Sequence, residues 1–264
     1  MKGIHFEIHT NDGTHRPARI PDGVRAYAIG DIHGCDAQLA ELQAKISQDV
    51  KTMPAGMVRR VIYLGDYVDR GPGSKAVVER LRQEAKENTI HLMGNHEQLM
   101  LDFIDGYPGG ESWLRVGGAQ TLESYGVRPK SGSIEAATTT EIREELTGLL
   151  PEAHDAFLRE LRSLYRLGDF VFVHAGIDPD FPIEAQKVSD LLWVRNKFLD
   201  SKLDHGCIIV HGHTVRRAPQ VFENRLGIDT GAFATGVLTC AVFEGETVRF
   251  LSAGDAHVAG QGRV

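Results

Sequence analysis

The stretch that decides the fold is Val61-Ile62-Tyr63-Leu64-Gly65-Asp66-Tyr67-Val68-Asp69-Arg70-Gly71. Its first four residues are apolar and rich in β-branched and aromatic types, which predicts a short buried strand that ends at Gly65. Two carboxylates and an arginine follow directly. Because ligands of α/β proteins bind beyond the carboxyl ends of the strands, we expect Asp66 to be the shared ligand of two metal ions there. Arg70 at the same edge could hold a phosphate.

The composition is that of an ordinary globular protein. The chain has 264 residues and a formal net charge of −7, which argues against a protein whose main task is to bind nucleic acid. Cys35, Cys207 and Cys240 form no CxxC pair, so we expect no structural disulfide and a reducing compartment. Residues 1–25 contain no apolar core of a signal peptide, and no apolar run approaches the ~20 residues of a membrane span. These features predict one cytoplasmic domain over residues 1–264, with no membrane partner.

Strand and helix signals alternate over the first hundred residues. The expected elements are strands at 24–29, 61–64 and 89–93 and helices at 36–50 and 74–85. This β-α-β-α-β order predicts parallel strands joined by right-handed crossovers. Before them, residues 4–20 alternate weakly around Asn11-Asp12-Gly13, which suggests a short hairpin at the edge of the fold.

The period of the apolar residues changes after residue 96. Four helices are expected, at 97–104, 111–125, 141–150 and 151–167. We interpret this block, about 97–167, as a helical cap inserted between strands, and its polar segment 128–140 as the most mobile internal loop. A further helix is expected at 190–199, and strands at 170–173, 207–210, 220–223, 225–228, 237–243 and 247–251. The strands after residue 220 predict a second, mixed or antiparallel sheet, and the polar tail from Ala253 is expected to fray. The fold class is therefore α/β (α+β).

Five strand ends carry side chains of the type that bind metal ions. They are Asp31 with His33, Asp66, Asn95, His174, and the pair His211 and His213. Each alone is more often structural, but each is accompanied by glycine or a tight turn that lets the side chain point into the crevice. Mixed oxygen and imidazole donors suit divalent first-row transition metals better than calcium. We therefore expect a two-metal site bridged by Asp66. A hydroxide held by both ions would attack phosphorus in line with the leaving group.

Acid–base residues are predicted around the same strand end. Arg70 cannot lose its charge and could neutralise phosphate oxygens, although it could also be a surface arginine in an ion pair. His96 follows Asn95 and could face the substrate from the opposite side. Asp69 could pair with His96, raise its pKa and orient its proton as a general acid requires, or could only stabilise the turn.

Five motifs stand in order between residues 30 and 214: Gly30-Asp31-Ile32-His33-Gly34, residues 65–71, Gly94-Asn95-His96-Glu97, His174-Ala175-Gly176 and Gly212-His213-Thr214. They resemble the motifs of the PPP-type, calcineurin-like metallophosphoesterases. That superfamily includes serine/threonine phosphatases, bacteriophage-lambda-type phosphatase and symmetrical diadenosine tetraphosphatase. The segments 190–195 and 228–232 resemble the bacterial branch in particular.

The resemblance implies a β-sandwich of two mixed sheets flanked by helices, and it implies a role for each motif residue. One metal would bind Asp31, His33 and Asp66, and the other Asp66, Asn95, His174 and His213. His213 is preferred over His211 because it lies inside Gly-His-Thr. His96 would be the general acid and Asp69 its partner, and the phosphate would be bound by Arg70, Arg195 and Asn95. Manganese is the ion implied, with iron or zinc as alternatives.

The expected function is that of a metal-dependent phosphomonoesterase, and first of all a protein phosphatase for phosphoserine, phosphothreonine or phosphotyrosine. Symmetrical diadenosine tetraphosphatase, or a related nucleotide hydrolase, shares the chemistry. A deeper pocket with a base-stacking platform, which Trp113 or Tyr125 could supply, would favour it. An inactive scaffold that binds phosphorylated partners is the third hypothesis, against which the intact motif residues argue. Met93 replaces the arginine that eukaryotic members carry, so no regulatory-subunit docking is inferred. The segment 97–140 matches no motif that defines a substrate, and the sequence does not indicate an oligomeric state.

Overall fold

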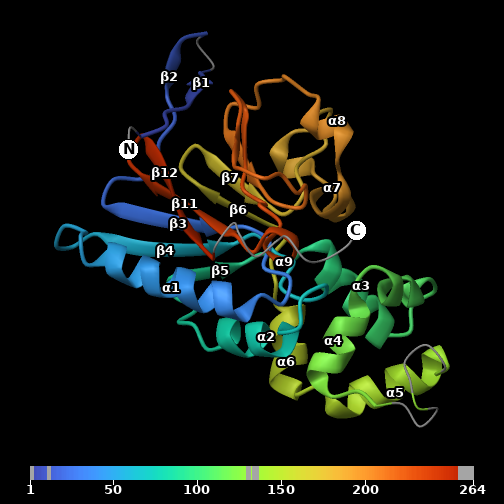
Figure 1. Cartoon of the computed structure of the whole chain (residues 1–264). Helices are drawn as coiled ribbons and strands as arrows, with labels where there is room; N and C mark the ends of the chain where they lie inside the picture. The colour runs from blue at the N-terminus through green and yellow to red at the C-terminus, as the bar shows by residue number, and fades with distance from the viewer. Residues whose placement is uncertain (1–2, 11–12, 129–131, 133–136, 255–264) are drawn as a thin grey trace.

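The computed structural model describes residues 3–10, 13–128, 132 and 137–254. Within these residues, two five-stranded mixed sheets lie one over the other (Figure 1). The first sheet has the order β12 (Thr247–Ala253), β11 (Leu238–Glu244), β3 (Val24–Ile29), β4 (Val58–Tyr63) and β5 (Thr89–His91). The second has the order β6 (Leu164–Leu167), β7 (Phe170–Val173), β8 (Ile208–His211), β10 (Arg225–Gly227) and β9 (Gln220–Val221). The predicted fold class is confirmed.

The parallel strands of the first sheet are buried on both faces, which explains their continuous apolar sequences. In β3, Ala26 and Ala28 face the second sheet, whereas Tyr27 and Ile29 face helices α1 (Asp36–Val50) and α2 (Ser74–Arg82). Strands β3, β4 and β5 are parallel, as the β-α-β-α-β order predicts. Their carboxyl ends therefore meet at one edge of the sheet, where the motif loops begin.

A helical cap follows β5. It comprises α3 (Asn95–Ile104), the 3-10 helix η1 (Gly110–Arg115), α4 (Gly118–Tyr125), α5 (Thr139–Leu149) and α6 (Glu152–Arg159). These elements enclose a separate apolar core around Phe103, Trp113 and Leu122, which also contacts Val68 and Val78 (Figure 1). The cap is thus packed directly onto the segment that follows β4.

The remaining elements are short. The second sheet is covered by η2 (Ile183–Ala185), α7 (Val188–Trp193) and α8 (Asn196–Leu199), and α9 (Ala232–Thr235) precedes β11. Strands β1 (Glu7–His9) and β2 (His15–Pro17) form the predicted hairpin, although its turn at Asn11-Asp12 lies outside the described residues. Most of the predicted mobile loop 128–140 and nearly all of the tail from Ala253 lie outside them too. None of the helices that the structure describes combines the length and apolar character that a membrane crossing requires.

Several sequence predictions are wrong in detail. The helix predicted over 151–167 ends at Arg159, because Arg162 instead exchanges backbone hydrogen bonds with His91 and Met93. Residues 164–167 then form β6, which pairs antiparallel with β7. The helix predicted over 111–125 is interrupted at Gly117, where φ is 122°, and the helix predicted over 190–199 is interrupted between α7 and α8.

The strands after residue 220 do not form one sheet. Strands β9 and β10 extend the second sheet, whereas β11 pairs with β3 and brings β12 to the edge of the first sheet. The cause is the extended antiparallel pairing of β11 with β3, in which Ala241 lies opposite Ala28. The first sheet thus takes strands from both halves of the chain, whereas the second takes its strands from residues 164–227, and both are mixed as expected.

His91 at the end of β5 makes stability depend on pH. Its ring stacks on Tyr63 with centroids 5.2 Å apart, and its buried Nε2 has no hydrogen-bond partner. Burial, helped by the charge of Lys86, lowers the pKa of His91 to about 4 from 6.5. The unfolded chain therefore takes up a proton at this site near pH 6.5, whereas the folded protein does so only near pH 4.

We expect acid to destabilise the natural protein more than it destabilises the His91→Phe variant, in which the aromatic stack is kept. The difference should develop as the pH falls from about 6.5 to about 4 and reach up to about 3 kcal/mol. Urea unfolding of both metal-free proteins across this range measures it. Parallel stability curves for the two proteins would contradict the expectation.

Candidate dinuclear metal site

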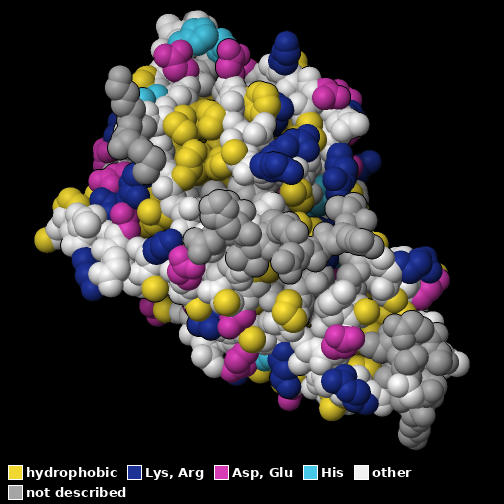
Figure 2. All heavy atoms as spheres, viewed as in Figure 1, with side chains coloured by type: hydrophobic (Ala, Val, Ile, Leu, Met, Phe, Trp, Pro, Cys, Tyr) yellow, Lys and Arg dark blue, Asp and Glu magenta, His cyan; other side chains and the backbone are white. Residues whose placement is uncertain are grey.

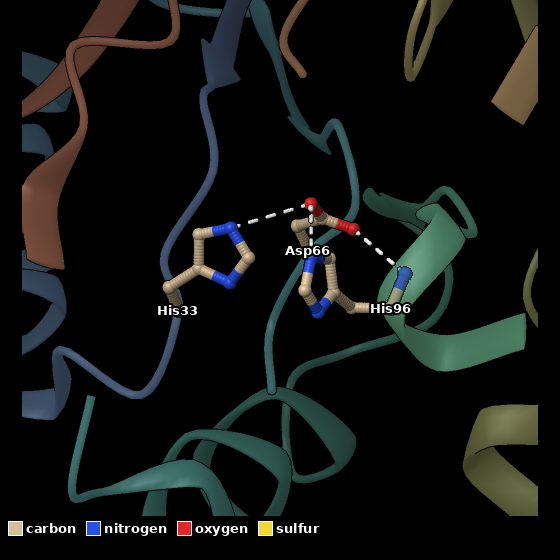
Figure 3. A group of neighbouring side chains, drawn as sticks. All are labelled: His33, Asp66 and His96. Carbon is tan, nitrogen blue, oxygen red and sulfur yellow. Dashed lines mark hydrogen bonds and ion pairs between the residues drawn. The ribbon is translucent and has the colours of Figure 1, made fainter. Parts of the chain in front are cut away.

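The predicted site residues converge at the carboxyl ends of strands from both sheets. Asp31 and His33 follow β3, Asp66 follows β4, Asn95 and His96 begin α3, His174 follows β7, and His213 follows β8. All seven side chains are buried. In Figure 3, the His33 ring points toward the Asp66 carboxylate from the loop after β3, and the His96 ring does so from the start of α3. The structure therefore brings the predicted metal ligands together around Asp66.

The site loops hold residues in an unusual backbone conformation. Among the described residues, the non-glycine positions with positive φ are His33, Asp66, Asp69, Arg70 and His213, at 46°, 53°, 74°, 67° and 62°. This left-handed region costs free energy for residues with a Cβ, and such strain concentrates at functional sites. All five belong to the predicted site. The surrounding structure must therefore hold them in place.

Glu97 provides much of that constraint. Its buried carboxylate accepts backbone N–H groups from Asp66, Tyr67 and Gly94 at 2.7–2.9 Å, and from Val68 at 3.1 Å. Burial, with the charge of Asp66 beside it, raises the pKa of Glu97 to about 7. The role of Glu97 was not predicted from the sequence, although its place in the motif after His96 was an available signal.

Glycines at two positions allow carboxylates to approach the backbone closely. A Cβ on Gly94 would overlap Asp66 Oδ1, and a Cβ on Gly212 would overlap Asp31 Oδ1. The backbone N–H of His96 donates to Asp66 at 3.1 Å, and that of His213 donates to Asp31 at 3.0 Å. The glycines before the site histidines thus let the loops wrap around these carboxylates.

Several acceptor atoms face one another near His174. Burial lowers the pKa of His174, so the ring is neutral, and its Nδ1–H donates to the carbonyl of Leu64 at 2.9 Å. Its Nε2 therefore presents a lone pair to Asn95 Oδ1 at 2.9 Å, His213 Nδ1 at 3.2 Å and Asp66 Oδ1 at 3.4 Å. Burial lowers the pKa of His213 as well. Lone pairs converging in this way repel one another unless a cation lies between them.

The described residues contain two groups whose ligand atoms could each hold one metal ion. One group is His33, Asp66 and His96, and the other is Asp66, His174 and His213. Because His213 Nδ1 faces His174 Nε2, the hydrogen of the neutral ring lies on the buried Nε2, and Nδ1 keeps a lone pair for an ion. Mixed carboxylate and imidazole donors suit divalent transition metals. The residues present therefore fit the two ions that the sequence implied, with Asp66 common to both groups.

Asp31 and Asp229 lie at the margin of the first group. Burial, Asp229 and Asp66 together raise the pKa of Asp31, which shows three carboxylates close together. Burial also raises the pKa of Asp229, against the opposing charges of His33 and Arg70. A cation would relieve this repulsion. The sequence analysis gave Asp229 no role, although its segment 228–232 resembled the bacterial branch.

The two late histidines occupy different surroundings. His213 belongs to the second metal group, whereas His211 packs against Phe198 and places Nδ1 at 3.1 Å from the Gly212 carbonyl. Among the predicted phosphate-binding residues, Arg195 is exposed at the start of α8, and its charge helps to lower the pKa of His213. Arg195 therefore faces the rim of the site rather than its floor.

Arg70, His96 and Asp69 form a hydrogen-bonded chain beside the first group. Arg70 places Nη1 at 3.0 Å from His33 Nε2 and Nη2 at 3.0 Å from His96 Nε2. His96 places Nδ1 at 2.6 Å from Asp69 Oδ2. Burial disfavours a charge on His96, but Asp66 and Asp69 outweigh it and raise the pKa of the ring. The predicted dyad is therefore present in the geometry, with an arginine fork across its open end.

Sequence comparisons agree with this geometry. The family model described as calcineurin-like phosphoesterase matches residues 24–230. The chain is 29% identical to the asymmetrical bis(5'-nucleosyl)-tetraphosphatase PrpE of Anoxybacillus flavithermus, over 83% of this chain and 91% of that one. It is 30% identical to serine/threonine-protein phosphatase 1 of Salmonella typhimurium, over 81% of this chain and 90% of that one.

Solved structures share the fold. A crystal structure described as a putative diadenosine tetraphosphatase matches with a TM-score of 0.60 at 21% identity, and covers 88% of this chain and 94% of that one. The cold-active protein-tyrosine phosphatase of a psychrophilic Shewanella species matches with a TM-score of 0.54 at 15% identity, and covers 94% of this chain and 90% of that one. At these identities the likeness is one of fold alone.

The close packing at Gly94 generates a prediction. Gly94→Ala pushes a methyl group against Asp66 and Glu97, so we expect a loss of about 1–3 kcal/mol in unfolding free energy and weaker metal binding. Gly148→Ala is the matched control, because Gly148 is exposed in α5 with open space around its Cα. That change should instead stabilise the protein by about 0.5–1 kcal/mol. Denaturant unfolding and metal titration measure both variants, and natural metal affinity in Gly94→Ala would contradict the packing argument.

Proposed function

Because the chain belongs to the calcineurin-like phosphoesterase family and is a metal-dependent phosphoester hydrolase, we propose that it is a phosphomonoesterase acting on phosphoserine, phosphothreonine or phosphotyrosine in proteins. The observation that carries the proposal is the chain formed by Arg70, His96 and Asp69 beside the acceptor cluster. It offers a fixed cation for phosphate oxygens and a proton donor for the leaving oxygen, which are the two needs of phosphoryl transfer.

The acceptor cluster would hold two divalent ions, for which we propose manganese, with iron or zinc as alternatives. Asp31, His33 and Asp66 would hold one ion, and Asp66, Asn95, His174 and His213 the other. His96 lies within reach of the first ion, but we assign it the acid role because its Nδ1 is bound to Asp69. When bound, the ions supply Lewis-acid charge to the phosphate oxygens and lower the pKa of the water that attacks phosphorus.

Arg70 would bind the phosphate through its guanidinium fork. The Arg70 Cζ atom lies 4.8 Å from the centroid of the Phe233 ring. This contact and the contacts to two histidines set the orientation of the Arg70 side chain. Asn95 would contribute its side-chain amide from the floor of the site, and the exposed Arg195 would close over the phosphate from the rim. A bidentate arginine contact holds a phosphate in one orientation, which places the leaving oxygen reproducibly.

His96 would protonate the leaving oxygen from Nε2. Its Nδ1 is bound to Asp69, so Nε2 is the ring nitrogen that remains directed toward the site. A protonated Nε2 cannot accept the hydrogen bond from Arg70, so the guanidinium becomes available to the phosphate as His96 becomes an acid. Asp69 stabilises the imidazolium and keeps the ring in the orientation for transfer.

A second function, hydrolysis of dinucleoside tetraphosphates, is favoured by the groove beside Arg70. The groove has a volume of about 450 Å³ and is lined by residues 34–38, 70–73 and 232–234 with Gly236. Its walls are mostly small or apolar side chains, and Phe233 is 38% exposed there. An exposed ring beside a phosphate-binding arginine could stack on a nucleobase. The predicted stacking residues Trp113 and Tyr125 are instead buried in the cap.

We further propose that the chain works as one domain in the cytoplasm. Strands β11 and β12 from the end of the chain complete the first sheet beside β3, β4 and β5, and the second sheet lies between them in sequence, which supports a single folding unit. Cys35, Cys207 and Cys240 are free and buried, and burial raises the pKa of each thiol, which suits proteins of reducing compartments. On the face shown in Figure 2, acidic and basic side chains are interspersed, unlike the basic stripe of nucleic-acid-binding proteins.

The role of His96 is tested by His96→Asn. We expect kcat to fall by about 10²–10⁴-fold, because the leaving oxygen loses its proton donor, while two metal ions per chain are retained. His154→Asn is the control, since this buried histidine contacts Tyr125 and Glu79 in and beside the cap and lies outside the site. Kinetics and elemental analysis measure both. Unchanged turnover in His96→Asn would refute the acid role.

The choice of substrate is tested by rates of the manganese-reconstituted protein on phosphoserine, phosphothreonine and phosphotyrosine peptides and on diadenosine tetraphosphate. We expect higher kcat/KM on a peptide, and Phe233→Ala should change the rates on all substrates by a similar factor, because the ring also contacts Arg70. A faster rate on the dinucleotide, with a KM that Phe233→Ala raises for the dinucleotide alone, would establish the second function instead. The products then distinguish symmetrical cleavage, to two ADP, from asymmetrical cleavage, to ATP and AMP.

A further inference from the structure

The part of segment 97–140 beyond Glu97, to which neither the motifs nor the metal site gives a role, reaches the site through Asp69. The Asp69 carboxylate is fully buried and accepts a hydrogen bond from the indole Nε1–H of Trp113 at 2.8 Å. It also accepts one from the Thr121 hydroxyl at 2.7 Å. Trp113 lies in η1 and Thr121 in α4, so both donors come from the cap. Both side chains are themselves fully buried.

The two donors fix the orientation of the carboxylate. Trp113 binds Oδ2, which is the oxygen that also accepts from His96, and Thr121 binds Oδ1. Rotation of the carboxylate would break both cap contacts as well as the contact to the histidine. Because Asp69 is buried, a donor that was lost could not be replaced by bulk water.

The cap also fixes the backbone of the same loop. The Asp69 N–H donates to the Thr121 hydroxyl at 2.8 Å and to the Ser74 hydroxyl at 3.0 Å. The Arg70 N–H donates to the Gly117 carbonyl at 3.2 Å. Asp69 and Arg70 are two of the residues with positive φ, so these contacts help to offset the cost of that conformation.

Gly117 and Gly118 lie where the cap packs closely against Arg70 and Trp113. A Cβ on Gly117 would lie 2.9 Å from Arg70 Cγ, and a Cβ on Gly118 would lie 2.7 Å from the Trp113 ring. Gly117 therefore admits the Arg70 loop, and Gly118 admits the indole. Trp113, Gly117, Gly118 and Thr121 act as one unit, spaced Trp-x3-Gly-Gly-x2-Thr.

We propose that this cap unit positions the acid dyad: Trp113 and Thr121 hold the Asp69 carboxylate in the one orientation that aligns His96 with the leaving oxygen. Trp113 and Thr121 are positioning residues, because they touch neither substrate nor metal ligand and act through Asp69. The proposal rests on the acid role of His96 proposed above. It gives η1 and α4 a function distinct from that of the metal ligands, which follow β3, β4, β7 and β8 or begin α3.

The experiment compares substrates with good and poor leaving groups. A general acid matters most when the leaving oxygen is basic, so 4-nitrophenyl phosphate, phenyl phosphate and a phosphoserine peptide form a graded series. Trp113→Phe removes the N–H and keeps a ring, Thr121→Val removes the hydroxyl and keeps the shape, and Thr121→Ser restores the hydroxyl. Tyr125→Phe is the control, because it removes one buried hydrogen bond of the same cap, to His154.

We expect Trp113→Phe and Thr121→Val to lower kcat about tenfold on the phosphoserine peptide and less than about twofold on 4-nitrophenyl phosphate. KM, metal content and melting temperature should follow those of Tyr125→Phe, and Thr121→Ser should recover most of the loss. His96→Asn should show the same leaving-group dependence in a stronger form.

Equal slowing on all three substrates by both Trp113→Phe and Thr121→Val would overturn the proposal, since loss of structure or metal acts uniformly. Trp113→Phe decides alone where Thr121→Val does not fold. If the loss of kcat in His96→Asn depends on the leaving group and the loss in Trp113→Phe does not, the positioning role fails and the acid role stands. If His96→Asn shows no such dependence, the acid role fails, and the positioning role fails with it.

Discussion

The buried carboxylate of Glu97 is the constraint on which the site depends. It gathers backbone N–H groups from Gly94 and from three successive residues, 66–68, so it ties the loop after β4 to the start of α3. Asp66 could not otherwise keep a φ of 53° in a buried loop, because its own N–H would lack an acceptor. Asp66, which both candidate metal groups share, is thus placed by a neighbour that belongs to neither group. The Glu97 carboxylate lies beside that of Asp66, so the two charges repel each other in the geometry that holds the loop.

Other groups of the cluster also face one another in ways that lower the stability of the metal-free protein. Neutral His174 presents its lone pair to Asp66, Asn95 and His213, and Asp31 lies among other carboxylates. Each arrangement destabilises the metal-free fold, since like partners face each other away from water. Ion binding turns these repulsions into ligation, so part of the binding free energy becomes folding free energy. The two five-stranded sheets supply the rigidity that keeps the acceptors converged without the ions.

The parallel strands, and the side chains that converge at their ends, could be predicted from the sequence for one reason. Buried parallel strands such as residues 61–63 are continuous in apolar character, and ligands at their ends are marked by adjacent glycines. Prediction from the sequence fails where a long-range contact overrides a local period. Leu161, Leu164 and Tyr165 continue the apolar spacing of α6, yet pairing with β5 and β7 makes this segment extended. Glu97, Asp229 and Thr121 were missed because a buried polar residue that serves a distant backbone or side chain leaves no periodic signal.

Within residues 61–71, two different supports meet. Up to Val68 the segment is held by the strands and by Glu97, and from Asp69 onward it is held by Trp113, Gly117 and Thr121 of the cap. Asp66 and Asp69 are thus three residues apart but are held by different elements, Asp66 by Glu97 of α3 and Asp69 by η1 and α4. Changes on the outer surface of the cap can therefore reshape the approach to the site without disturbing the metals. Changes at its inner contacts should alter proton transfer first, because Asp69 is the point at which the cap enters the chemistry.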